Sequence, residues 1–144
     1  MKKKILVLIL LFVYSCGYSP IYKKSNIRDY EIIISTLSGD VTMNNLIKNE
    51  IEMYSKKNSS NRYIVELNSS YSKNIISKDN SGIASNYELM VIANFTVDTK
   101  KFTFKEKLNV KNISDSLEQR NYENIIKKNF AASIREKLLR KLLN

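Results

Sequence analysis

The feature that most constrains the fold of this chain is a strict alternation of apolar and polar residues near its centre. From residue 87 to residue 97 every odd position is apolar: Tyr87, Leu89, Val91, Ala93, Phe95 and Val97. Successive side chains of a β-strand point to opposite faces, so this period of two predicts a strand with one buried face. Met90 and Ile92 interrupt the polar positions, and we therefore expect part of the outer face to be covered as well.

Two neighbouring segments repeat this alternation and predict two more strands. Residues 101–110 follow closely, and the intervening Asp98-Thr99-Lys100 is short enough for a hairpin. Upstream, residues 63–71 alternate in the same way. A turn is expected at Asn80-Ser81-Gly82, because these residue types favour turn conformations. The three segments together predict an antiparallel arrangement.

A further strand and a helix are predicted before this group. The segment from Tyr30 to Leu37 is rich in β-branched residues, which favour a strand, and Ser38-Gly39-Asp40 closes it. Apolar residues then recur at spacings of three and four, which is typical of an amphipathic helix with Asp40 or Thr42 as its N-cap. The predicted buried face of this helix holds Met43, Ile47, Ile51 and Tyr54.

The chain ends in a second amphipathic helix, which we expect to begin at Asp115 or Ser116. Its apolar residues lie four apart, at Tyr122, Ile126, Phe130, Ile134, Leu138 and Leu142. The predicted order is therefore β-α-β-β-β-α. Since one face of a single sheet must be buried, we expect an α+β domain with two helices packed on a four-stranded mixed sheet. This domain would span residues 30–144.

The amino terminus has the parts of an export signal. Lys2, Lys3 and Lys4 precede an apolar run from Ile5 to Val13, which fits the roughly 7–15 residues of a signal-peptide core and is too short to span a bilayer. Val13-Tyr14-Ser15-Cys16 resembles the bacterial lipobox, although Tyr14 replaces the usual small residue. The resemblance implies cleavage after residue 15, lipid attached to Cys16 and a tether from 16 to 29.

Two alternatives remain for this segment: a free thiol behind an ordinary secretory signal, or an uncleaved anchor. Gly17 stands where an aspartate would resemble the inner-membrane retention signal of many enterobacterial lipoproteins. We therefore expect the protein to be anchored in the outer membrane and to face the periplasm.

Composition limits the chemistry that the chain can perform. It carries a formal charge of +10, part of which reflects a Lys-, Asn- and Ile-rich composition, and it favours acidic partners. With no histidine, one cysteine and three glycines, we expect no metal site, no cofactor and no enzyme activity. The export signal argues against a nucleic-acid partner, which charge alone would suggest.

Three segments resemble LptE-type lipopolysaccharide-assembly lipoproteins. Cys16-Gly17-Tyr18 with Pro20-Ile21-Tyr22 resembles their lipidated opening, residues 84–95 resemble their third strand, and Ala131-Ala132 through Leu142 resembles their closing helix. The resemblance covers the whole mature chain. It implies a non-catalytic subunit that plugs the outer-membrane β-barrel LptD, assists its folding and helps deliver lipopolysaccharide to the outer leaflet.

The resemblance also implies cationic residues that contact lipopolysaccharide phosphates, near the turn between the second and third strands and near the start of the last helix. The basic residues available there are Lys73, Lys78 and Arg120. Each is alternatively a solvated surface charge. The rival function is a periplasm-facing lipoprotein that binds peptidoglycan or supports another envelope assembly machine.

Overall fold

The structure is a computed structural model that describes residues 30–143. Its elements are β1 (Tyr30–Gly39), α2 (Val41–Tyr54), β2 (Asn61–Lys78), β3 (Ala84–Val97), β4 (Lys100–Lys111) and α3 (Ser116–Leu143). The predicted order β-α-β-β-β-α is confirmed. The predicted signal peptide (1–15), the tether (16–29) and Cys16 lie outside the described residues.

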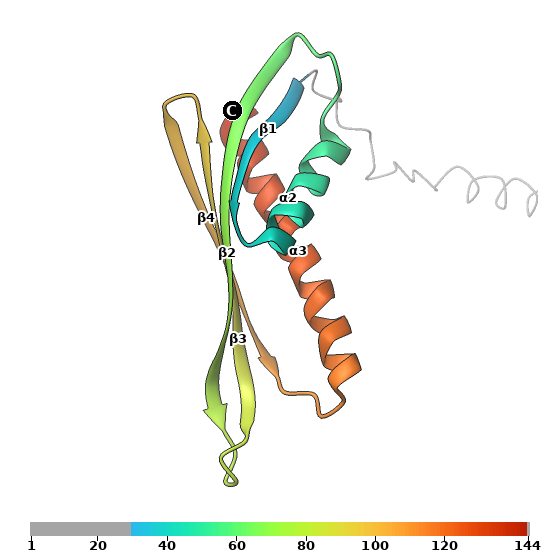
Figure 1. The fold of residues 1–144 in the computed structure, drawn as a ribbon, viewed down its shortest axis with the longest axis vertical. Helices are drawn as coiled ribbons and strands as arrows, with labels where there is room; N and C mark the ends of the chain where they lie inside the picture. The colour runs from blue at the N-terminus through green and yellow to red at the C-terminus, as the bar shows by residue number, and fades with distance from the viewer. Residues whose placement is uncertain (1–29, 144) are drawn as a thin grey trace, which may run out of the picture.

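The four strands form one sheet in the order β1-β2-β3-β4. β1 pairs with β2 in parallel, and α2 makes the crossover between them, while β2, β3 and β4 are antiparallel. The sheet is therefore mixed, as predicted. Both helices lie on one side of it (Figure 1).

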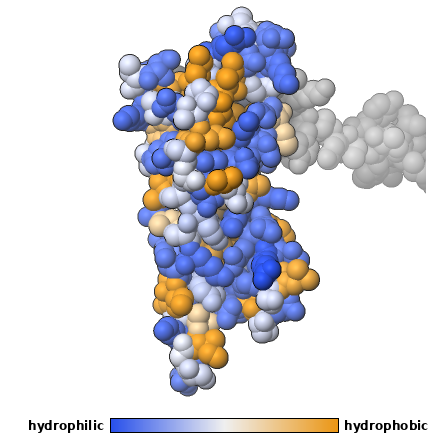
Figure 2. Space-filling model, in the orientation of Figure 1, coloured by the Kyte–Doolittle hydropathy of each residue, from blue (hydrophilic) through white to orange (hydrophobic). Residues whose placement is uncertain are grey.

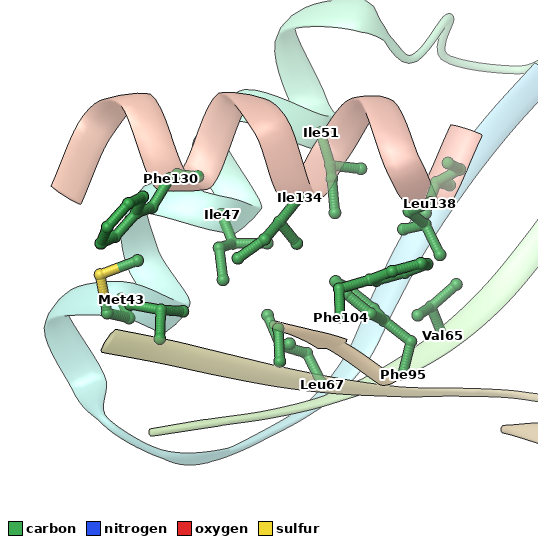
Figure 3. Packing of buried hydrophobic residues seen from close by; sticks show 14 of the residues in the cluster. Met43, Ile47, Ile51, Val65, Leu67, Phe95, Phe104, Phe130, Ile134 and Leu138 are labelled. Atoms are coloured by element: carbon green, nitrogen blue, oxygen red, sulfur yellow. The ribbon is translucent and has the colours of Figure 1, made fainter. Parts of the chain in front are cut away.

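The hydrophobic core lies between that face of the sheet and the two helices, as Figure 3 shows. All five odd-numbered apolar residues of β3 from Leu89 to Val97 are buried, which confirms the alternation. Each helix contributes one buried stripe. The buried helix residues named in the predictions are Met43, Ile47, Ile51, Ile126, Phe130, Ile134 and Leu138.

Two predicted core residues are instead exposed. Tyr54 is 51% exposed at the end of α2, where its ring stacks 3.9 Å from the Arg135 guanidinium. Tyr122 is 40% exposed, because it lies in the first turns of α3, beyond the end of α2 (Figure 1). The predicted helical periodicity is confirmed, but the length of α2 decides which turns of α3 it covers.

The boundaries follow local chemistry. Asp40 caps α2, since its Oδ1 accepts a hydrogen bond from Met43 N at 2.7 Å. Asp115 does the same for α3, accepting from Leu117 N and Glu118 N. β2 continues to Lys78, well past the predicted end at Tyr71, because its backbone pairs with β3 as far as Ala84. None of the helices within residues 30–143 is long and apolar enough to cross a membrane.

Candidate functional site

The β2–β3 hairpin extends beyond the helices at the end of the molecule where α3 begins (Figure 1). We call residues 75–84 the hairpin tip. Of the three predicted contact residues, Lys78 lies in this tip. Lys73 lies earlier in β2 and Arg120 lies in the first turns of α3, so the structure places all three at this end but not in one cluster.

Lys73 is tied to the helix. Its ammonium group forms an ion pair and hydrogen bond with the Glu123 carboxylate of α3 and lies 4.2 Å from the centroid of the Tyr87 ring. Glu123 also accepts a hydrogen bond of 2.8 Å from Gln119 Nε2. We call these four residues the β2–α3 seam. The charge of Lys73 is therefore largely compensated within the fold.

The seam holds Glu123 in its charged form. Burial by itself would raise the pKa of Glu123, but the hydrogen bonds from Lys73 and Gln119 and the charges of Lys73 and Lys127 outweigh it and lower the pKa below its usual value. The carboxylate consequently remains a partner for Lys73 at neutral pH.

Tyr71 lies next to the seam on the same face of β2. Lys127 Nζ lies 4.2 Å from the centroid of its ring. Burial, with the negative charges of Glu123 and Asp40, raises the pKa of Tyr71 to about 12, so its hydroxyl stays neutral. That hydroxyl is buried and has no hydrogen-bond partner within residues 30–143. This part of the contact between the sheet and α3 is polar, in contrast to the apolar core between the sheet and the two helices.

Lys78 and Arg120 differ from Lys73. Both are exposed, and neither forms an ion pair with any residue in the range 30–143. Lys78 is five residues beyond Lys73, about 17 Å along an extended strand. These two cations are therefore available to an external anion.

Apolar residues of the hairpin tip are also exposed, and they are not among the predicted contact residues. Ile75, Ile76 and Ile83 are 53%, 49% and 60% exposed. The pairing of β2 with β3 shifts between Ile75 and Ser77, and such a bulge redirects side chains. Figure 2 shows hydrophobic residues within a hydrophilic surface at this end. The signal was the Ile75-Ile76 pair in an otherwise polar segment.

The tip is held in a defined shape. Asp79 N donates to Ile83 O at 2.8 Å and Gly82 N donates to Asp79 O at 3.0 Å. The Asp79 side chain accepts from Ser81 N and Ile83 N, and Gly82 has a φ of +81°, as the predicted turn requires. The exposed isoleucines and Lys78 are thus presented on a preformed turn.

This end of the molecule combines exposed branched aliphatic side chains with two cations that form no ion pair inside the described range. Such a surface suits a ligand that carries an anionic head and apolar chains. Within the described residues there is no group of three or more His, Cys, Asp or Glu side chains that could hold a metal ion.

No protein-family model matches the sequence, and no curated protein matches it either. Solved structures do match. Rare lipoprotein B from Shewanella oneidensis superposes with a TM-score of 0.56 at 13% identity, over 75% of this chain and 93% of that one. The domain has the fold of rare lipoprotein B.

A candidate lipoprotein from Caulobacter crescentus shares this rare lipoprotein B fold. It superposes with a TM-score of 0.57 at 13% identity, over 81% of this chain and 88% of that one. Because the match spans most of both solved chains, the whole β-α-β-β-β-α arrangement is common to them, and not just a single hairpin.

Proposed function

We propose that this protein is a lipid-anchored outer-membrane lipoprotein of the LptE type, which plugs and helps fold an LptD-type β-barrel and assists delivery of lipopolysaccharide to the outer leaflet. The observation that carries the proposal is the fold shared with rare lipoprotein B along 93% of that chain. The lipobox-like segment ending at Cys16 supports the same class of protein. The protein acts by binding and not by catalysis.

The hairpin end supports a lipopolysaccharide-binding role. Lipid A presents phosphates beside acyl chains. This end presents Lys78 and Arg120, neither of which has an ion pair within residues 30–143, and the exposed side chains of Ile75, Ile76 and Ile83. Lys and Arg neutralise phosphates directly. Lys73 belongs to the same proposed contact, but its pairing with Glu123 gives it the smaller share.

The partner is tested by affinity capture of the tagged full-length protein from detergent-solubilised outer membrane. We expect one large, heat-modifiable β-barrel of the LptD type in near-equal amount. Recovery of the lipoprotein alone would contradict the proposal. Recovery with cell-wall fragments would instead favour the peptidoglycan-binding alternative.

Lipopolysaccharide contact is tested with the double variant Lys78→Ala, Arg120→Ala. We expect capture of purified lipopolysaccharide to fall by about tenfold, since two charge-assisted contacts are lost. The matched control is Lys57→Ala, Lys141→Ala, which removes two exposed cations elsewhere. All four sites are exposed, so stability should change by no more than about 0.5 kcal/mol in either variant. Equal losses in both would indicate a non-specific charge effect and contradict the assigned site.

A further inference from the structure

The second face of the sheet carries neither helix nor strand among residues 30–143, because α2 and α3 both lie on the opposite side (Figure 1). Its side chains come from the positions that alternate with the buried ones. We call this surface the open face. Met90 and Ile92 predict that this face is partly covered. No element of the described domain provides that cover.

Met90 and Ile92 form a small apolar centre on the open face. Both are half-buried. In register, Ile92 lies between Ser70 of β2 and Lys105 of β4, and Met90 lies between Ser72 and Lys107. Ile33 and Ile64, which are opposite each other in β1 and β2, are also exposed on this face at 37% and 57%. An apolar centre with a polar rim is the usual arrangement of a protein interface.

A row of lysines borders this centre along β4. Lys101, Lys105, Lys107 and Lys111 all point to the open face, as their alternation with buried Phe104 and Val110 requires. Only Lys107 has an acidic partner within residues 30–143, Glu88 at 3.6 Å. Of the carboxylates on this surface, Glu31 pairs with Arg62 and Glu88 with Lys107, so Glu66 is the one without an ion pair among residues 30–143. The open face therefore has an excess of positive charge.

Edge protection explains only part of this arrangement. Lysines on an edge strand discourage pairing with other sheets, and β4 is an edge strand. That role does not require apolar residues in the middle of the sheet, where a solvated face would carry polar ones. Met90 and Ile92 are in β3, an interior strand, so the two features together indicate a surface that is covered by a partner.

We propose that the open face is the surface that docks onto the barrel partner, against a wall lined with carboxylates, with Met90 and Ile92 at the centre of the contact and the β4 lysines along its border. This assignment rests on the proposed function for the identity of the partner. The helices would then face away from that wall.

The test compares two triple charge reversals in the tagged full-length protein. The open-face variant is Lys101→Glu, Lys105→Glu, Lys111→Glu, and the control is Lys57→Glu, Lys128→Glu, Lys141→Glu, which changes exposed cations in the α2–β2 loop and on α3. We expect the open-face variant to recover about tenfold less barrel than wild type, since like charges repel across an interface, and the control to recover a normal amount.

Each outcome has a separate meaning. Normal recovery with the open-face variant and loss with the control would overturn the docking face and leave the proposed function intact. No barrel with wild type would overturn both. If the open-face variant keeps the barrel but loses binding to phosphatidylglycerol vesicles, the face binds lipid and the proposal is wrong.

A second variant covers the case in which the triple reversal does not fold, which circular dichroism melting would reveal. Ile92→Thr keeps a β-branched side chain in the strand and removes apolar surface from the open face. A several-fold lower recovery of barrel with a folded Ile92→Thr protein supports the proposal. Unchanged recovery overturns it.

Discussion

At the scale of the residue, the tightest constraint lies at Gly39, the last residue of β1. Gly39 has a φ of +85°, and a Cβ added there would lie 2.0 Å from the backbone oxygen of Ser69. The next residue, Asp40, donates its N–H to the same oxygen at 2.7 Å. The end of β1 therefore lies so close to β2 that no side chain fits at Gly39.

Substitution of the two positive-φ glycines separates this close approach from conformational strain. Gly39→Ala should lower the free energy of unfolding by about 3 kcal/mol or more, because the clash adds to the left-handed backbone penalty. Gly82→Ala has an equivalent φ of +81° but nothing within 4 Å, and should cost about 1 kcal/mol. Urea denaturation of both variants measures the difference. Equal losses would contradict the close approach.

At the scale of the element, the β2–α3 seam is where the long last helix contacts the sheet through charge instead of apolar packing. Lys73 of β2 pairs with Glu123 of α3. Gln119, also in α3, donates to the same carboxylate and accepts from Ile113 N at 2.8 Å. These contacts fix the first turns of α3, which α2 does not reach.

The lowered pKa of Glu123 predicts a pH dependence for this seam. A carboxyl whose folded pKa is below its unfolded pKa stabilises the protein above the unfolded pKa, and that stability is lost as the pH falls through the folded pKa. Glu123→Gln should therefore cost about 1 kcal/mol at pH 7, and the difference from wild type should shrink below about pH 4.

Urea denaturation at pH 7 and at successively lower pH values measures this change. Glu118→Gln, at an exposed site one turn earlier, is the matched control and should show little difference at any pH. A Glu123→Gln difference that is the same at pH 7 and pH 3 would mean that the side-chain shape, and not its charge, stabilises the seam.

At the scale of the whole molecule, the folded domain and the predicted site of membrane attachment lie in different parts of the chain. The described core between the sheet and the helices is formed by residues of the range 30–143, and Cys16 lies outside that range. Cys16→Ala should leave the thermal unfolding midpoint of the domain unchanged and release the protein from the membrane fraction, because the lipid would no longer be attached.

Fractionation of cells that lack the barrel partner is the direct measurement, since a bound barrel would hold the variant in the membrane fraction. If Cys16→Ala remains membrane-bound in such cells, the lipobox interpretation is wrong. A serine substitution at Cys16 should behave in the same way and checks that loss of the thiol, and not the choice of alanine, causes the release.

The candidate site was only partly predictable from sequence. The positions of Lys73, Lys78 and Arg120 near one end followed from the order of the elements. The order of the elements does not show which of these cations has an acidic partner, because Glu123 is 50 residues from Lys73 along the chain. The exposure of Ile75 and Ile76 was also missed, since it depends on a shift in strand register that no local pattern encodes.

Local patterns by themselves determined the order of the elements and the buried positions of β3, and they offered Asp40 or Thr42 as the cap of α2, because each depends on residues a few positions apart. Only the tertiary structure decided the rest. It buried Asn44 and Ser69, which pair at 2.8 Å, covered part of α3 and placed no helix or strand of residues 30–143 on the second face of the sheet. These outcomes depend on contacts between distant segments, and the alternation of a strand shows that one face is buried without showing what covers the other.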